Sequence, residues 1–249
     1  GTGSVAIAAG NSTISNASPV SGLDQRGFSR ITSDIGAYAV SNLIQVTTTA
    51  DTIDPNDNLT SLREAINLAN TTAGDDQISF NLSSGSSPYT ITLGSALPTI
   101  LDATATVGAG TRGTLAINGL GTTSLIISGN NGDPLRDFNI FNIATGGNLF
   151  INGVTVSGAQ TTGDGGAFNN SGTLVISNST ISGNSANTFG GGIYNNGNLD
   201  IFSTSIFGNN AGDQRYGNHG GYGGATFNKG TLRISNSNIS GNNADYGGA

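Results

Sequence analysis

A repeat of about 25 residues runs through the second half of the chain. Four segments share one pattern, in which a leucine, an isoleucine two residues later and a third apolar residue five residues after that recur in phase. The leucines are separated by 25, 25 and 33 residues, and the other two positions keep the same spacing. The aligned residues are Leu149, Leu174, Leu199 and Leu232; Ile151, Ile176, Ile201 and Ile234; and Val156, Ile181, Ile206 and Ile239.

Within each repeat, apolar and polar residues alternate over short runs, which is the periodicity of β-strands. Such short strands cannot bury an apolar face alone, but stacking them at the ~4.8 Å inter-strand spacing sets each leucine and isoleucine on its counterpart. Leucine-rich repeats need helical or extended convex segments, and a propeller blade needs about 40 residues. A glycine-rich linker would not keep its apolar positions in phase. The repeat therefore predicts an all-β fold, a parallel β-helix.

Glycine and asparagine mark the corners of this predicted solenoid. The chain has 40 glycines in 249 residues, and a Gly-Gly block recurs near residues 165, 191, 223 and 247. Asn184, Asn209 and Asn242 each follow a glycine at the same place in successive repeats. Glycine permits positive φ at such corners, and asparagine tolerates it better than most residues. Stacked asparagine side chains can also hydrogen-bond along a ladder.

The front half of the chain contains one convincing helical pattern, in Thr60-Ser-Leu-Arg-Glu-Ala-Ile-Asn-Leu-Ala-Asn. Thr60 or Ser61 is a suitable N-cap, and Glu64 follows at capping-box distance. A solenoid must cover its open hydrophobic end, and a short amphipathic helix does that. Strand-like runs then follow at 77–80, 89–93, 114–117 and 124–128. We divide the chain into a closing segment (1–40), a linker (41–58), the capping helix with irregular early coils (59–125) and regular coils (126–249).

The run from Ser61 to Asn70, with Gly74-Asp-Asp-Gln-Ile-Ser-Phe after it, resembles the N-terminal motif of the CSLREA family of parallel β-helix proteins. Thr60 stands where that family usually has cysteine. The later coils are also similar to those of polymorphic outer-membrane-protein repeats. The resemblance covers roughly residues 45–249. It implies a right-handed β-helix in an exported, surface-attached or adhesive protein, usually without enzyme activity.

A second resemblance to this family lies at the opposite end of the chain. Leu23-Asp-Gln-Arg-Gly-Phe-Ser-Arg and Asp34-Ile-Gly-Ala-Tyr resemble the segment that normally closes the C-terminal end of the β-helix, so the order is permuted. If Gly1 followed Ala249, Val5 would lie 22 positions beyond Leu232, and Ile14 would match Ile239. We therefore expect residues 1–40 to be the missing last coils of such a helix.

Two explanations of the permuted order stay open at this point. The chain is either one period of a longer tandem-repeat surface adhesin, or a subunit of a head-to-tail filament in which residues 1–20 complete the open C-terminal coil of a neighbour. Backbone hydrogen bonds and apolar pockets hold such a donated strand, and a contact that does not close generates a filament. The expected subunit contacts are Val5, Ile7, Ile14, Leu232, Ile234 and Ile239.

Composition narrows the possible partners. The net charge is −7 and Lys229 is the only lysine, so the chain lacks the basic stripe that nucleic-acid binding requires. No apolar run approaches the roughly 18 residues of a membrane span. The absence of methionine suggests a processed or excised chain. A surface poor in lysine and rich in asparagine, serine, threonine and glycine fits an extracellular or cell-surface location.

Few residues offer catalytic or metal-binding chemistry. The chain lacks cysteine, and Glu64 is its only glutamate, so we expect no enzyme activity; a polysaccharide lyase or hydrolase is the enzymatic alternative. Asp51, Asp54 and Asp57 could form a weak calcium site, although a solvated turn is the simpler interpretation. An insertion in the 33-residue step forms a candidate binding loop for glycans or a neighbouring subunit. Its polar and aromatic residues are Asp213, Arg215, Tyr216, His219 and Tyr222.

Overall fold

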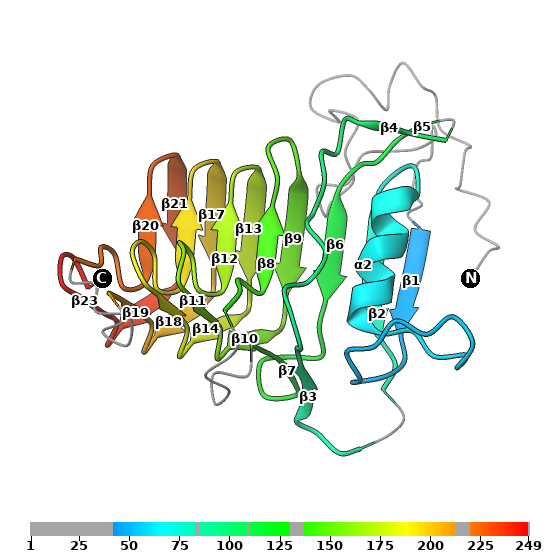
Figure 1. Ribbon diagram of the computed structural model, residues 1–249, viewed down its shortest axis with the longest axis horizontal. Coiled ribbons are helices and arrows are strands. Elements are labelled where there is room, and N and C mark those ends of the chain that lie inside the picture. Colours follow the sequence, from blue (N-terminus) through cyan, green and yellow to red (C-terminus); the bar gives the residue numbers. More distant parts are fainter. Residues whose placement is uncertain (1–41, 83–84, 109, 130–136, 213–219, 249) are drawn as a thin grey trace.

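In the computed structural model, the chain winds into a parallel β-helix whose coils stack along one axis (Figure 1). The structure describes residues 42–82, 85–108, 110–129, 137–212 and 220–248. The expected all-β solenoid class is confirmed, with four parallel sheets running along the stack and one α-helix at its N-terminal end. The closing segment expected in residues 1–40 lies outside the described residues.

The strands of successive coils assemble into sheets. The first sheet contains β1 (Asn42–Val46), β2 (Asp76–Phe80), β6 (Leu115–Asn118), β9 (Asn148–Asn152), β13 (Thr173–Ser177), β17 (Asn198–Phe202) and β21 (Thr231–Ser235). The second contains β3 (Tyr89–Thr92), β7 (Leu125–Ser128), β10 (Thr155–Ser157), β14 (Thr180–Ser182), β18 (Ser205–Phe207) and β22 (Asn238–Ser240). The third contains β8 (Phe141–Ile143), β12 (Phe168–Asn170), β16 (Ile193–Asn195) and β20 (Thr226–Asn228). The fourth contains β11 (Gln160–Thr161), β15 (Ser185–Ala186), β19 (Asn210–Ala211) and β23 (Asn243–Ala244). A short antiparallel pair, β4 (Thr106–Val107) and β5 (Gly110–Thr111), stands apart.

The register of these sheets is the alignment read from the repeat. Leu149 pairs with Leu174, Leu174 with Leu199, and Leu199 with Leu232, so like residues stack through the regular coils. The same holds for Ile151 and for Val156 with their counterparts in later coils. The 33-residue step keeps this register because its extra residues leave the coil between β19 and β20.

The helix α2 (Leu62–Thr71) lies against β1 and β2 at the N-terminal end of the stack (Figure 1). Ser61 is its N-cap, and Glu64 completes the capping box. The expectation that residues 41–58 form a linker is wrong at its start, because Asn42–Val46 forms β1 and pairs in register with β2. Among the described residues, no helix is long and apolar enough to cross a membrane.

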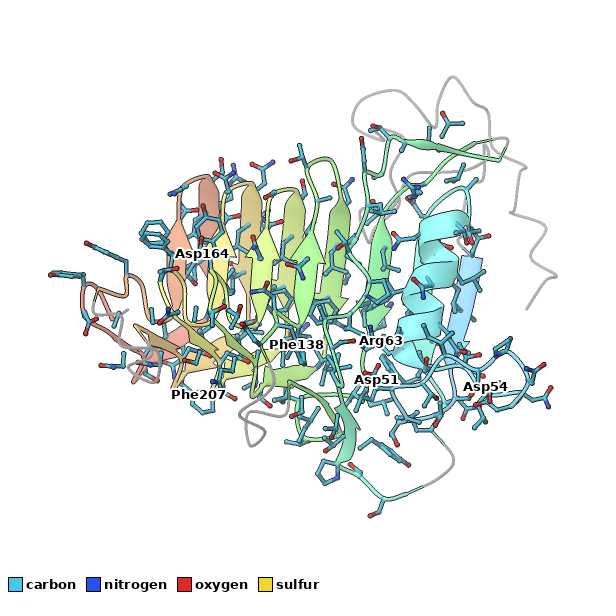
Figure 2. All side chains as sticks on the ribbon, viewed as in Figure 1. Asp51, Asp54, Arg63, Phe138, Asp164 and Phe207 are labelled. Carbon is cyan, nitrogen blue, oxygen red and sulfur yellow. The ribbon has the colours of Figure 1, made fainter. Side chains whose placement is uncertain are left out.

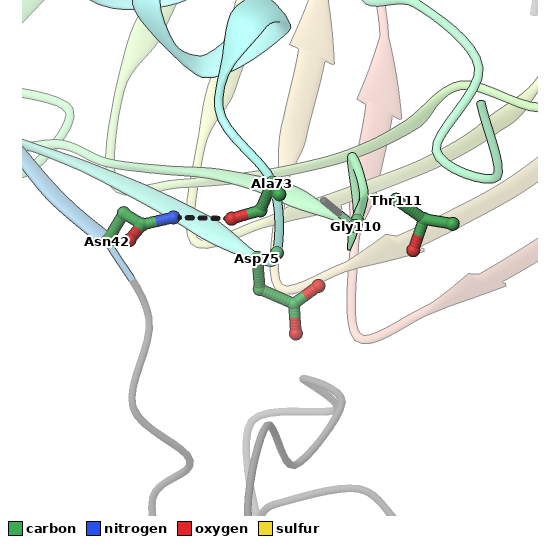
Figure 3. Close-up of a pocket in the computed structure, with 7 residues that line it drawn as sticks. Asn42, Ala73, Asp75, Gly110 and Thr111 are labelled. Atoms are coloured by element: carbon green, nitrogen blue, oxygen red, sulfur yellow. Dashed lines mark hydrogen bonds between the residues drawn. The ribbon is translucent and has the colours of Figure 1, made fainter. Parts of the chain in front are cut away.

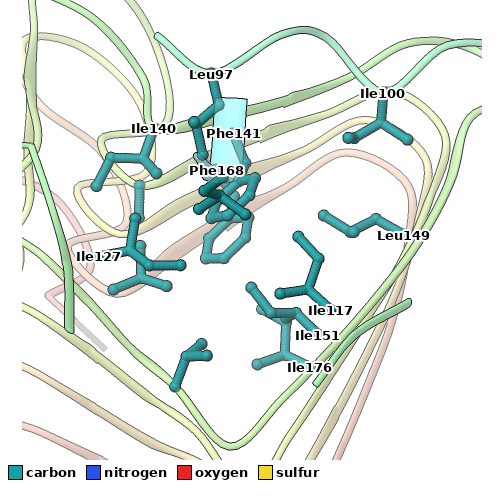
Figure 4. Close-up of a cluster of buried hydrophobic side chains, with 14 of the residues drawn as sticks. Leu97, Ile100, Ile117, Ile127, Ile140, Phe141, Leu149, Ile151, Phe168 and Ile176 are labelled. Carbon is teal, nitrogen blue, oxygen red and sulfur yellow. The ribbon is translucent and has the colours of Figure 1, made fainter. Parts of the chain in front are cut away.

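The interior of the solenoid is filled by stacked aliphatic and aromatic side chains (Figure 4). Ile117, Ile151 and Ile176 form one column along the first sheet, and all three are fully buried. Phe141 and Phe168 stack with their ring centroids 5.2 Å apart and their planes 9° apart. Because each coil buries its apolar residues on those of the next, the burial of any coil depends on a neighbour on both sides.

Candidate functional site

The C-terminal end of the stack ends in unpaired sheet edges. In the described part of the chain, β20, β21, β22 and β23 are each the terminal strand of their sheet, with a hydrogen-bonded neighbour on one side only. Figure 1 shows these strands at the end of the solenoid opposite α2. Edge strands carry rows of free N–H and C=O groups, which are templates for pairing with another strand.

The apolar core is uncovered at this same end. Leu199, Ile201 and Ile206 of the preceding coil are at most 0% exposed, whereas Ile234 is 42% exposed. Leu232 and Ile239 are only partly buried against the core. The structure therefore brings together the three predicted contact residues Leu232, Ile234 and Ile239. Their expected partners Val5, Ile7 and Ile14 lie outside the described residues.

Two asparagine ladders also lead to the open end. In the first, the Asn184 amide donates to Asn209 Oδ1 at 2.9 Å, and the Asn209 amide donates to Asn242 Oδ1 at 2.9 Å, which confirms the predicted ladder. In the second, the Asn170 amide donates to Asn195 Oδ1 at 2.7 Å, and the Asn195 amide donates to Asn228 Oδ1 at 2.6 Å. Hydrogen bonds thus link each coil to the next as specifically as the core packing does.

The second ladder is incomplete at its last member. The Asn195 amide also donates to the backbone carbonyl of Thr231 in the following coil, at 2.9 Å. The Asn170 amide does the same toward the Asn198 carbonyl, at 3.0 Å. Among the described residues Asn228 has no following coil, and its amide donates to the nearby Gly230 carbonyl at 2.9 Å. A further coil would supply the acceptors that this position has elsewhere.

A cluster of aromatic rings lies on one flank near the open end, and sequence reasoning assigned it no role. Tyr222 and Tyr246 stack at 4.7 Å and are 40% and 58% exposed. Phe189, Tyr194 and Phe227 extend the cluster, and Lys229 Nζ lies 5.4 to 5.7 Å from the centroids of these three rings. The signal was present in the sequence, since Phe189, Tyr222 and Tyr246 each precede a recurring Gly-Gly block.

Of the predicted binding loop, only Tyr222 lies within the described residues, and it belongs to this aromatic cluster. Asp213, Arg215, Tyr216 and His219 lie outside them. The structure therefore places one member of the expected loop on the flank beside the open end.

The three aspartates considered for calcium do not converge on one site. Asp51 makes a two-pronged ion pair with Arg63, with both N–O distances 2.8 Å (Figure 2). Asp54 accepts the backbone N–H of Asn56, and Asp57 accepts that of Leu59. Within the described ranges, no three His, Cys, Asp or Glu side chains gather as a metal-binding group. Asp51 thus holds the capping helix in place.

A pocket of about 400 Å³ lies at the N-terminal end, near the start of β2. Its walls are Asn42, Ala73, Gly74, Asp75, Gly110, Thr111 and Gly113, and Figure 3 shows Asp75 on one side of it. Asp75 accepts the Thr114 N–H at 2.8 Å. The next residue, Asp76, is 3% exposed, and burial raises the pKa of its carboxyl to about 7.

This acidic pair was missed as a site, although Gly74-Asp-Asp was singled out as part of a family-like motif. Side chains of successive residues in an extended strand point to opposite faces. Asp75 and Asp76 therefore do not face one another across a substrate, as the two carboxylates of a glycosidase do. The open C-terminal end, where core, edges and ladders all stop together, is the stronger candidate site.

Comparisons with family models, curated proteins and solved structures found no match for this chain.

Proposed function

We propose that this chain is an extracellular structural or adhesive β-helix protein that assembles head to tail into a filament. In the proposed contact, residues 1–20 of one copy form a coil on the open C-terminal end of its neighbour. The observation that carries the proposal is the coincidence of four edge strands with an uncovered core at Leu232, Ile234 and Ile239. We further propose membership of the CSLREA family, on the motifs at residues 61–80.

The chemistry of the open end favours another β-coil over other partners. An added strand would pair with the free backbone groups, and its alternate side chains would enter the core column. The end is also narrow and ringed by strand edges, so a helix would leave those backbone groups unpaired. Since the contact joins unlike surfaces of two copies, repetition gives an open-ended filament. A coil from a later period of a tandem-repeat adhesin would make the same contact within one polypeptide, and this is the alternative.

Light scattering and electron microscopy of the purified chain test the filament. We expect fibres with an axial advance of about 40 Å per subunit, from the seven strands of the first sheet plus a donated coil at ~4.8 Å each. A single polypeptide much longer than this chain in the native fibres would favour the tandem array instead. A monodisperse monomer with residues 1–20 folded on its own chain would overturn the filament.

A matched pair of variants separates the open end from general surface effects. Ile234→Glu places a charge on the uncovered core, and Phe207→Glu places one on the flank, where Phe207 is 46% exposed (Figure 2). Both positions are similarly exposed, but only the first lies at the proposed contact. We expect Ile234→Glu to abolish fibres and Phe207→Glu to leave them intact.

The aromatic cluster favours a second function, contact with glycans on a cell surface. Exposed tyrosines offer a flat apolar face with a polar edge, which is the kind of surface found at binding sites. A glycan array would be probed with the unaltered chain, Tyr222→Ala with Tyr246→Ala, and Phe207→Ala as the control. Binding lost only in the tyrosine variant would support this function, and equal binding by all three would exclude the cluster. Turnover of pectin-like polymers by the unaltered chain would instead support the polysaccharide lyase or hydrolase.

A further inference from the structure

The second sheet shows what a coil needs in order to stack at the open end, beginning with a sharp corner. Three residues before the buried apolar position, the backbone has positive φ in four successive coils. The residues are Gly153, Asn178, Ser203 and Asn236, with φ of 67°, 46°, 47° and 50°. Few residues other than glycine adopt this conformation, and asparagine is among the best tolerated.

The next residue carries a hydroxyl that joins neighbouring coils. Val154 N–H donates to Ser179 Oγ at 3.3 Å, and Ser179 N–H donates to Thr204 Oγ1 at 3.4 Å. Thr204 N–H donates to Ser237 Oγ at 3.1 Å, so every member accepts from the coil before it. Each hydroxyl proton is already donated to the carbonyl two residues earlier. We call this series the hydroxyl rung.

The rung ends with one donor unanswered. Within the described residues, the Ser237 N–H has no acceptor, although the same group in Thr204, Ser179 and Val154 has one. A hydroxyl in a following coil would complete the series. The donated segment should therefore contain Ser or Thr two residues before its buried isoleucine.

The corner after the buried residue sets one more requirement. Gly183, Gly208 and Gly241 have φ of 62°, 63° and 59°. A Cβ built on Gly183 or Gly241 meets no atom within 4 Å. The place therefore has room for a side chain, provided that the residue tolerates positive φ, as asparagine does.

One segment of the chain outside the described residues meets all of these requirements. In Asn11-Ser-Thr-Ile-Ser-Asn, Asn11 falls on the first corner, Ser12 on the hydroxyl rung and Ile14 on the core column, and Asn16 falls on the second corner. It matches Asn178-Ser-Thr-Ile-Ser-Gly, a coil of known register, at every residue except the last.

Resting on the proposed function, we infer that Asn11–Asn16 of a second copy forms the strand after β22, with Ser12 on Ser237 and Ile14 on Ile239. In this register, Ser12 Oγ accepts the Ser237 N–H. Ala17 occupies the place that follows Asn184, Asn209 and Asn242, so the first asparagine ladder stops at Asn242. The rung and the core column, rather than that ladder, fix the alignment of the two copies.

Because the chain has no cysteine, engineered cysteines test this register cleanly. A chain with Thr13→Cys is mixed with a chain with Asn238→Cys and treated with diamide as oxidant. Both positions point outward from the sheet, because they alternate with Ile14 and Ile239. In-register neighbours in adjacent strands lie ~4.8 Å apart, which a disulfide spans. The controls pair Thr13→Cys with Asn236→Cys or Ser240→Cys, two residues out of register, at about 8 Å.

We expect disulfide-linked dimers from Thr13→Cys with Asn238→Cys, and at least tenfold fewer from either control. If the unaltered chain forms fibres but a control pair cross-links better, the register is overturned while the filament stands. If light scattering finds no association and the disulfide forms only within a doubly substituted chain, both the second-copy partner and the filament are overturned.

A gain-of-function variant gives an independent readout. Ala17→Asn would extend the first ladder, with its Oδ1 accepting the Asn242 N–H as Asn242 Oδ1 now accepts the Asn209 N–H at 3.1 Å. We expect the critical concentration for assembly to fall several-fold. Thr13→Asn, which points outward, is the control and should leave it unchanged. Equal critical concentrations for Ala17→Asn and the unaltered chain would contradict the register.

Discussion

The two ends of the solenoid are built from similar strands but are finished differently. At the N-terminal end, α2 covers the stack and buries Leu62, Ala65, Ile66 and Ala69 against it. At the C-terminal end, Ile234 is 42% exposed in the described structure, although its register partner Ile201 is fully buried. The same residue type in the same register is thus core or surface according to what lies on its far side.

The capped end should be the costliest to break. Arg63 donates to Asp51 and to the carbonyls of Ser95 and Ala96, so it ties the helix to the first coils. Its side chain and that of Asp51 are only 12% and 8% exposed. Arg63→Ala leaves the Asp51 carboxylate buried without its partner, and we expect a loss of about 3 kcal/mol or more in the free energy of unfolding. Urea denaturation measures this, with Arg233→Ala as an exposed control; a loss no larger than the control's would contradict this role for Arg63.

Isoleucine truncations compare the middle of the stack with the open end. Ile206→Ala removes a fully buried side chain and should cost about 2–5 kcal/mol. Ile239→Ala occupies the same column but is only partly buried, so we expect less than about 2 kcal/mol below the assembly concentration. If the proposed contact forms, the loss at Ile239 should grow toward that at Ile206 in assembled material. Equal losses in dilute, unassociated chains would show that the open end is already covered.

The second asparagine ladder gives a finer version of the same comparison. Asn195 is fully buried and bonded on both sides, so Asn195→Ala should cost about 1–3 kcal/mol. Asn228 lacks a following coil among the described residues, and Asn228→Ala should hardly change the thermal stability of the unassociated chain. We expect it instead to raise the critical concentration for assembly. A change in melting temperature as large as that of Asn195→Ala would show that Asn228 already acts as a core position.

The comparison of the two ends also explains what the sequence could predict. The leucine and isoleucine columns repeat in phase, so parallel stacking and its register follow from spacing alone. The helix was placed to within two residues, because Ser61 and Glu64 form a local capping box. By contrast, β1 was assigned to a linker. The early first-sheet steps, from Asp76 to Leu115 and from there to Leu149, span 39 and 34 residues and carry no common phase.

The candidate site was predictable only in part, for a related reason. Leu232, Ile234 and Ile239 were identified because they end columns that the repeat defines. The aromatic cluster depends on which rings the 33-residue step carries onto one flank, and the burial of Asp76 depends on the loops around the capped end. Neither follows from spacing, since both arise where the chain departs from its regular coil.

The smallest expected effect lies at the capped end and depends on pH. Burial raises the pKa of Asp76 from its ordinary value of 3.8 to about 7 in the folded protein, while its side-chain hydrogen bond with Asn42 opposes the shift. Between these values the folded state holds more protons than the unfolded state, so the free energy of unfolding falls as the pH rises. The stability associated with this group is fully present below about pH 4 and is lost as the pH passes through 7.

Asp76→Asn removes the titrating carboxyl and keeps an acceptor for Asn42. We expect its melting temperature to match that of the unaltered chain near pH 4 and to exceed it by a few degrees at pH 8. Asp200→Asn, on the outer face of the same sheet, serves as the control and should show no such divergence. A constant offset between Asp76→Asn and the unaltered chain across this range would mean that Asp76 is no more desolvated than a surface carboxylate. The capped end would then be wetter than its fully buried neighbour Ile78 indicates.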